Sequence, residues 1–111
     1  MAKVLISPGK YVQGAGEMKK LGEYAQNYGK KALILISKGG YKRIGVMVEK
    51  SFEGKECGYV FDYFNGECSK KEIKRLGEIV KKEACDVVIG IGGGKIFDTA
   101  KAVAYYEKTP V

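Results

Sequence analysis

The segment DVVIGIGGGKIFD, residues 86–98, decides the fold of this chain. It opens with an almost continuously apolar run, which is typical of a strand covered on both faces by helices. Three consecutive glycines follow at residues 92–94, and apolar residues then recur at the spacing of a buried helix face. A strand, a glycine turn and a helix in immediate succession indicate an α/β domain with a parallel sheet.

The rest of the chain alternates in the same way between short apolar runs and helical patterns. Further strands are predicted at residues 4–6, 11–13, 32–36 and 59–64, and helices at 17–28, 44–52 and 69–80. Ser69 and Glu72 fit a capping box at a helix start, and residues 37–40 are interpreted as the end of a strand. The predicted fold class is α/β, a Rossmann-like parallel sheet flanked by helices, in one domain over residues 1–111.

The charge of the chain is strongly positive. Its 20 basic and 13 acidic residues give a net charge of +7, which suits either nucleic acid or a cofactor that carries phosphates. The lysines recur along the whole chain, mostly on the polar faces of predicted helices, and form no compact stripe with interleaved aromatic residues. We therefore expect a solvated surface and no nucleic-acid partner.

Cysteine and histidine usage argues against a metal or disulfide framework. The chain has three cysteines, no CxxC pair and no histidine, so neither a zinc site nor a disulfide scaffold is supported. No apolar run reaches the length of a signal peptide or a membrane span. We expect a cytoplasmic protein with reduced thiols and no membrane partner.

The glycine turn is the candidate site for chemistry. Glycines let an anion approach the backbone, the amides of the first helical turn donate to it, and Lys95 adds a positive charge. Asp98, expected in the first helical turn, could accept from ribose or substrate hydroxyls, or could only stabilise the helix. These features predict a phosphate or pyrophosphate site, the alternative being that Gly92, Gly93 and Gly94 only make a tight turn.

Two other phosphate-binding loops do not fit this segment. A Walker A loop needs glycine where Ile89 stands and a hydroxyl residue where Ile96 stands, so an NTPase is not expected. The dinucleotide pattern GxGxxG can start at Gly90, but it then needs glycine or alanine at Lys95. An ordinary Rossmann fingerprint is therefore missing.

Three segments carry a resemblance to a known family. They are SPGKYVQG at residues 7–14, FNGECS at 64–69, and GIGGGK at 90–95 with DTAKA at 98–102. Together they resemble glycerol dehydrogenases of the iron-containing alcohol dehydrogenase superfamily. Serine usually follows the glycine turn in that superfamily, whereas Lys95 points to the glycerol branch.

The resemblance implies a two-domain enzyme that oxidises glycerol to dihydroxyacetone with NAD. It implies a zinc ion held by one aspartate and two histidines of a helical C-terminal domain, where the metal acts as a Lewis acid. Since this chain has no histidine, we expect no metal ligand and no catalytic residue in it. It would be the truncated N-terminal dinucleotide-binding domain of such an enzyme, inactive by itself.

The resemblance also assigns binding roles. Gly93, Gly94 and Lys95 would hold the cofactor pyrophosphate, Gly92 is also expected in the cofactor site, and Asp98 would lie toward the nicotinamide ribose. At the position where the family generally has an aspartate for the adenosine ribose, this chain has Ser37. With Lys38, Lys42 and Arg43 close by in sequence, use of NADP becomes conceivable, although NAD is the expected cofactor.

Other interpretations stay open. The parent could be a sister enzyme, such as a glycerol-1-phosphate dehydrogenase or a dehydroquinate-synthase-like protein. The chain could also be a non-catalytic nucleotide-binding or interaction module, or a basic nucleic-acid-binding domain. Residues 109–111 have the look of the opening of another strand, and a sheet edge left exposed there could pair with a second copy in a homo-oligomer.

Overall fold

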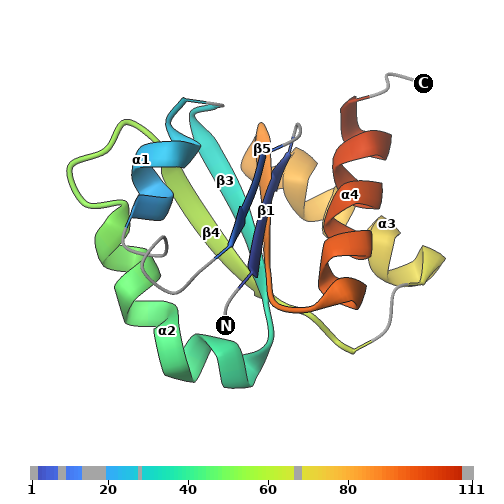
Figure 1. Cartoon of the computed structure of the whole chain (residues 1–111). Coiled ribbons are helices and arrows are strands. Elements are labelled where there is room, and N and C mark those ends of the chain that lie inside the picture. The colour runs from blue at the N-terminus through green and yellow to red at the C-terminus, as the bar shows by residue number, and fades with distance from the viewer. Residues whose placement is uncertain (1–2, 8–9, 14–19, 28, 67–68, 109–111) are drawn as a thin grey trace.

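The computed structural model describes residues 3–7, 10–13, 20–27, 29–66 and 69–108. Its elements, drawn in Figure 1, are β1 (Lys3–Ser7), β2 (Lys10–Gln13), α1 (Leu21–Ala25), β3 (Lys31–Ile36), α2 (Lys38–Ser51), β4 (Gly58–Tyr63), α3 (Lys70–Glu83), β5 (Val87–Ile91) and α4 (Gly94–Lys108). The five strands form one sheet in the order β2-β1-β5-β3-β4. The predicted α/β fold is confirmed.

The sheet is mixed rather than wholly parallel. β3 pairs in parallel with β4 and with β5, as the helical crossovers between them require. β1 instead runs antiparallel to both β2 and β5. The expectation of a parallel sheet therefore holds for the three strands that are joined by helices and is wrong for the first two. Only two residues separate β1 from β2, too few for the crossover that a parallel pair needs.

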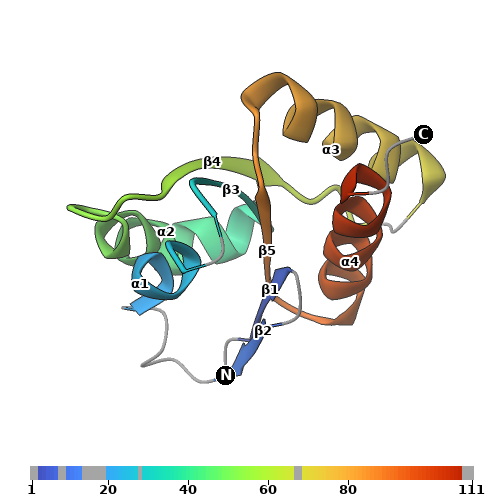
Figure 2. The same cartoon turned by 90° about the horizontal axis from the view of Figure 1, so that it is seen from above.

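Helices cover both faces of the parallel strands. Figure 2 shows α1 and α2 on one side of the sheet and α3 and α4 on the other. Alternate residues of β3 supply the two cores: Ala32, Ile34 and Ile36 pack with Val48 and Phe52, while Leu33 and Leu35 pack with Leu76 and Val103. The continuously apolar runs of β3 and β5 are fully buried, which explains why neither alternates with polar residues.

Serine caps define the starts of two helices. The Ser69 hydroxyl accepts from the Glu72 amide at 3.1 Å, so the predicted start of α3 is confirmed. The Ser37 hydroxyl accepts from the Gly40 amide at 3.0 Å, and α2 begins at Lys38, earlier than the apolar spacing predicts. Gly39 and Gly40 thus belong to the helix rather than to a loop, because Ser37 caps it.

Some predicted features lie partly outside the described residues. The helix predicted at 17–28 is seen as the short α1, and residues 14–19 and 28 are outside the described part of the chain, as are residues 109–111. In the described ranges, no helix combines the length and the apolar character needed to cross a bilayer.

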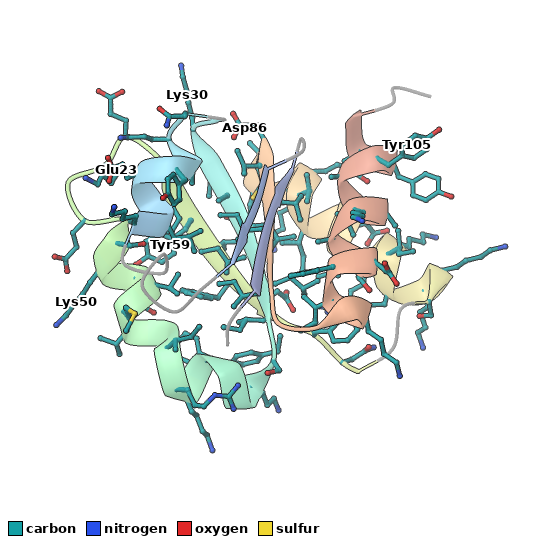
Figure 3. All side chains as sticks on the ribbon, in the orientation of Figure 1. Glu23, Lys30, Lys50, Tyr59, Asp86 and Tyr105 are labelled. Carbon is teal, nitrogen blue, oxygen red and sulfur yellow. The ribbon has the colours of Figure 1, made fainter. Side chains whose placement is uncertain are left out.

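The amino edge of the parallel strands is fastened by one carboxylate. Asp86, just before β5, accepts from the backbone amides of Lys30 and Lys31 at 2.9 Å, and Figure 3 shows the Lys30 and Asp86 side chains at the same edge. Partial burial raises the pKa of Asp86, but these hydrogen bonds lower it more, to a net value below the ordinary one. This contact joins the starts of β3 and β5, whose ladder ends at the pair Ile36 and Ile91.

Candidate functional site

The carboxyl ends of β3 and β5 form the point where the chain leaves the sheet toward both faces. The two strands are parallel neighbours, and Ile36 lies opposite Ile91. After Ile36 the chain enters α2 on one face, and after Ile91 it enters α4 on the other, as the lower part of Figure 1 shows. In open α/β sheets, ligands bind in the crevice at such a switch point. The structure therefore brings Ser37 and the glycine turn to one place.

At two positions of this segment, glycine is required by the structure itself. A Cβ on Gly90 would lie 3.1 Å from the Ala100 Cβ, so Gly90 allows α4 to pack closely on β5. Gly92 has a φ of +144°, and a Cβ there would lie 2.7 Å from Ile96 Cδ1. For these two positions, the interpretation as a tight turn with close packing is sufficient.

Gly93 and Gly94 are different. A Cβ built on either glycine would meet nothing within 4 Å, both residues are exposed, and neither has a positive φ. Neither the packing nor the backbone conformation of the described residues requires glycine at these two positions. What their missing side chains leave open is access from solvent to the backbone at the start of α4.

The first turn of α4 is well defined. The Phe97 amide donates to the Gly93 carbonyl at 3.1 Å, and the buried Thr99 hydroxyl donates to the Lys95 carbonyl at 2.8 Å. The amides that open a helix have no acceptor within it and point out of its end. Lys95 is exposed at this end, so amide dipoles and an ammonium group meet at the same opening.

Asp98 is not where the sequence places it. The first turn of α4 comprises residues 94–97 and contains no acidic residue. Asp98 is the fifth helical residue and is exposed. The prediction of a first-turn carboxylate is wrong because α4 begins already at Gly94, so Asp98 opens the second turn.

Ser37 acts as the cap of α2. Its side-chain oxygen accepts from Gly40, and its carbonyl accepts from the Tyr41 amide at 2.9 Å. The side chain is half-buried, and the basic residues that follow, Lys38, Lys42 and Arg43, are exposed. The carboxyl end of β3 is thus followed by a hydroxyl group and then by exposed basic residues in the first part of α2.

An ion-pair network at the end of β4 was not predicted. Glu72 is 1% exposed, and both its oxygens accept from the Arg75 guanidinium at 2.8 Å. Arg75 also contacts Asp62 at 3.0 Å, and the Asn65 amide donates to Glu72 at 3.4 Å. The Arg75 hydrogen bond lowers the pKa of Glu72, against the effect of burial. The available signal was the three-residue spacing of Glu72 and Arg75, which the capping-box interpretation masked.

The metal implied by the resemblance does not fit this chain. Within the described ranges, no three or more His, Cys, Asp or Glu side chains gather as a metal site would need, and the sequence has no histidine. No step through a metal is assigned to these residues.

Comparison with known proteins places this geometry in a family. The model of a protein family described as "Iron-containing alcohol dehydrogenase" matches residues 8–110. Glycerol dehydrogenases of Citrobacter freundii and Escherichia coli are 41% and 42% identical over the whole chain, which spans 30% of their length. The fold is also similar to the crystal structure of a probable glycerol dehydrogenase from Sinorhizobium meliloti, with a TM-score of 0.74 and 34% sequence identity. The match covers 85% of this chain and 24% of the Sinorhizobium meliloti chain.

These matches confirm the resemblance to glycerol dehydrogenases. The match to the glycerol dehydrogenases covers all three segments that carry the resemblance, including the strand, glycine turn and helix at residues 86–98. On this evidence, the chain belongs to the iron-containing alcohol dehydrogenase family.

Proposed function

We propose that this chain is the dinucleotide-binding part of a glycerol dehydrogenase, and that residues 92–95 hold the pyrophosphate of a nicotinamide dinucleotide. One observation carries the proposal: Gly93 and Gly94 have open space where side chains would be, at the switch point of the sheet. A pyrophosphate can approach the backbone only where such side chains are missing.

The chemistry of the opening supports an anionic group. The amino end of α4, where a helix carries partial positive charge, lies at the switch point, and Lys95 adds a positive charge there. Hydrogen bonds to ionised phosphate oxygens are stronger than those between neutral groups, so a few such donors are enough to anchor a ligand. The residues present therefore fit a dinucleotide.

In this proposal, Ser37 and Asp98 contact the two riboses on either side of the pyrophosphate. Ser37, at the end of the strand next to the glycine turn, would lie at the adenosine ribose. Asp98, exposed one turn into α4, would accept from a hydroxyl of the nicotinamide ribose. Asp98 remains suitable outside the first turn, because there its charge is farther from the phosphates.

The reaction of the longer enzyme is part of the same proposal. The bound nicotinamide dinucleotide would take a hydride from glycerol, and the hydroxyl proton would be released, giving dihydroxyacetone; a zinc ion would be held by residues outside this chain. The contribution of this chain is to bind the cofactor and fix its orientation. By itself, we expect it to oxidise no glycerol, with or without added zinc.

Calorimetric titration of the purified chain with NAD, NADP and ADP-ribose tests the binding site. Gly94→Val fills the open approach, and Lys95→Ala removes the charge. The matched controls are Gly58→Val at the amino edge of β4, where a Cβ would make only ordinary contacts, and the exposed Lys101→Ala, further along α4.

We expect weak, saturable binding that falls about tenfold or more in Gly94→Val and Lys95→Ala and is retained in both controls. Circular dichroism of each variant confirms that it is folded. Binding that survives in both site variants would place the dinucleotide elsewhere. A folded wild-type chain that binds none of the three ligands would contradict the proposal.

A further inference from the structure

We propose that the adenosine end of this site is built for a 2′-phosphate, so that the chain prefers NADP to NAD, with Arg43 and Lys38 deciding the preference. The inference rests on the proposed function, because it concerns the other end of the same dinucleotide. The resemblance implies NAD, whereas the charges that the fold gathers beside Ser37 favour the phosphorylated cofactor.

The argument begins with where the adenosine would lie. A dinucleotide anchored at the glycine turn after β5 extends its adenosine over the end of the neighbouring strand. That strand is β3, which ends at Ile36 opposite Ile91, so Ser37 is the first residue beneath the ribose. An acidic residue at such a position accepts from a ribose 2′-hydroxyl, whereas an arginine nearby accommodates a 2′-phosphate.

No carboxylate occupies this end of β3. Residues 37–43 read SKGGYKR, and the first turn of α2 contains no acidic residue. Asp62, near the end of β4, is already paired with Arg75 at 3.0 Å. Glu49 accepts from the Tyr41 hydroxyl at 2.6 Å, more than two turns along α2. A phosphate at Ser37 therefore meets no unpaired acid from these elements.

Two basic side chains lie near the carboxyl end of β3. Arg43 Nη1 lies 3.6 Å from the position that a Cβ would have on Gly39, so the guanidinium folds back over the first turn of α2. Lys38 Nζ lies 5.8 Å from the centre of the Tyr63 ring, at the carboxyl ends of β3 and β4. Among the described residues, neither Arg43 nor Lys38 forms an ion pair with a carboxylate.

The two cations suit a phosphate monoester in different ways. The planar guanidinium of Arg43 can donate two parallel hydrogen bonds to one phosphate group, and Lys38 adds a point charge. The Ser37 hydroxyl accepts from Gly40 and can still donate its own hydrogen to a phosphate oxygen. These groups give NADP contacts that NAD lacks.

Calorimetry with NADP, NAD, adenosine 2′,5′-bisphosphate and ADP tests the preference. We expect the wild-type chain to bind NADP at least tenfold more tightly than NAD, and the bisphosphate more tightly than ADP. Arg43→Ala should lose about tenfold of the NADP affinity and leave NAD affinity unchanged within about twofold. The matched control is Lys50→Ala, at the far end of α2, where Figure 3 shows the side chain pointing into solvent.

A gain-of-charge variant separates recognition from folding. Ser37→Asp keeps a helix-capping oxygen, because aspartate caps as well as serine does, but places a carboxylate beneath the ribose. It should bind NAD more tightly than NADP. Wild-type binding of NAD over NADP would overturn this inference and leave the proposed function intact. An NADP preference that persists in both Arg43→Ala and Ser37→Asp would overturn it as well, and a folded chain that binds no dinucleotide would overturn both proposals.

Discussion

Ile36 and Ile91 are register partners in the last paired positions of β3 and β5. The helices that follow these strands, α2 and α4, pack on opposite faces of the sheet, which makes this pair the switch point where open α/β sheets bind ligands. The candidate site therefore arises from strand order and handedness of the connections, and the side chains of Ser37 and Lys95 only complete it.

Substitutions at Gly90 and at Gly93 should differ in their effect on the free energy of unfolding. Gly90→Val should lower the free energy of unfolding by about 1–3 kcal/mol, since its side chain would press on Ala100 and Ile96. Gly93→Ala should change it by less than about 0.5 kcal/mol, because its Cβ would meet open space. Urea titrations followed by circular dichroism measure both values, and equal losses would contradict this division of roles.

Ser51 joins α1 to α2 through a buried hydrogen bond. Its hydroxyl accepts from the Gly22 amide at 3.0 Å and donates to the Val48 carbonyl at 2.6 Å. Ser51→Ala would leave the buried Gly22 amide without its acceptor and should cost about 1–3 kcal/mol. Faster hydrogen exchange of the Gly22 amide, absent in the neighbouring Lys50→Ala control, would locate the effect, and unchanged exchange would contradict it.

Removal of Arg75 should be costly because Glu72 is buried. Arg75→Ala leaves an uncompensated carboxylate that is 1% exposed, and we expect a loss of about 2 kcal/mol, below the usual range for buried pairs since Arg75 itself is partly exposed. The double variant Glu72→Gln with Arg75→Ala should recover part of it, and the exposed Lys74→Ala is the control. No difference between Arg75→Ala and Lys74→Ala in urea denaturation would refute the expectation.

Glu72 should also make the stability depend on pH. Arg75 holds its folded-state pKa below the ordinary value of 4.5, so its contribution is present above 4.5 and is lost as the pH falls through the folded pKa. Asp86 acts in the same direction. The urea midpoint should therefore fall on acidification below about 4.5, and Glu72→Gln should fall less steeply. Parallel curves for the two proteins would show that Glu72 does not contribute.

The sequence alone determined the local part of this structure. Apolar runs without alternation predicted the buried strands β3 and β5, helical spacing predicted α2 and α3, and Ser69 predicted a helix start. The glycine turn was found as a candidate phosphate site from its residues and their order. Such features depend on neighbours within a few positions along the chain, which a sequence displays directly.

The tertiary structure decided everything that depends on distant residues meeting. The antiparallel pairing of β1 with β5, the Glu72–Arg75–Asp62 network and the place of Asp98 beyond the first turn were not readable from local patterns. Nor was the difference between Gly90, needed for packing against Ala100, and Gly93, which has open space before it. Strand register and helix faces settle these points, because they fix which side chains, far apart in sequence, share one volume of space.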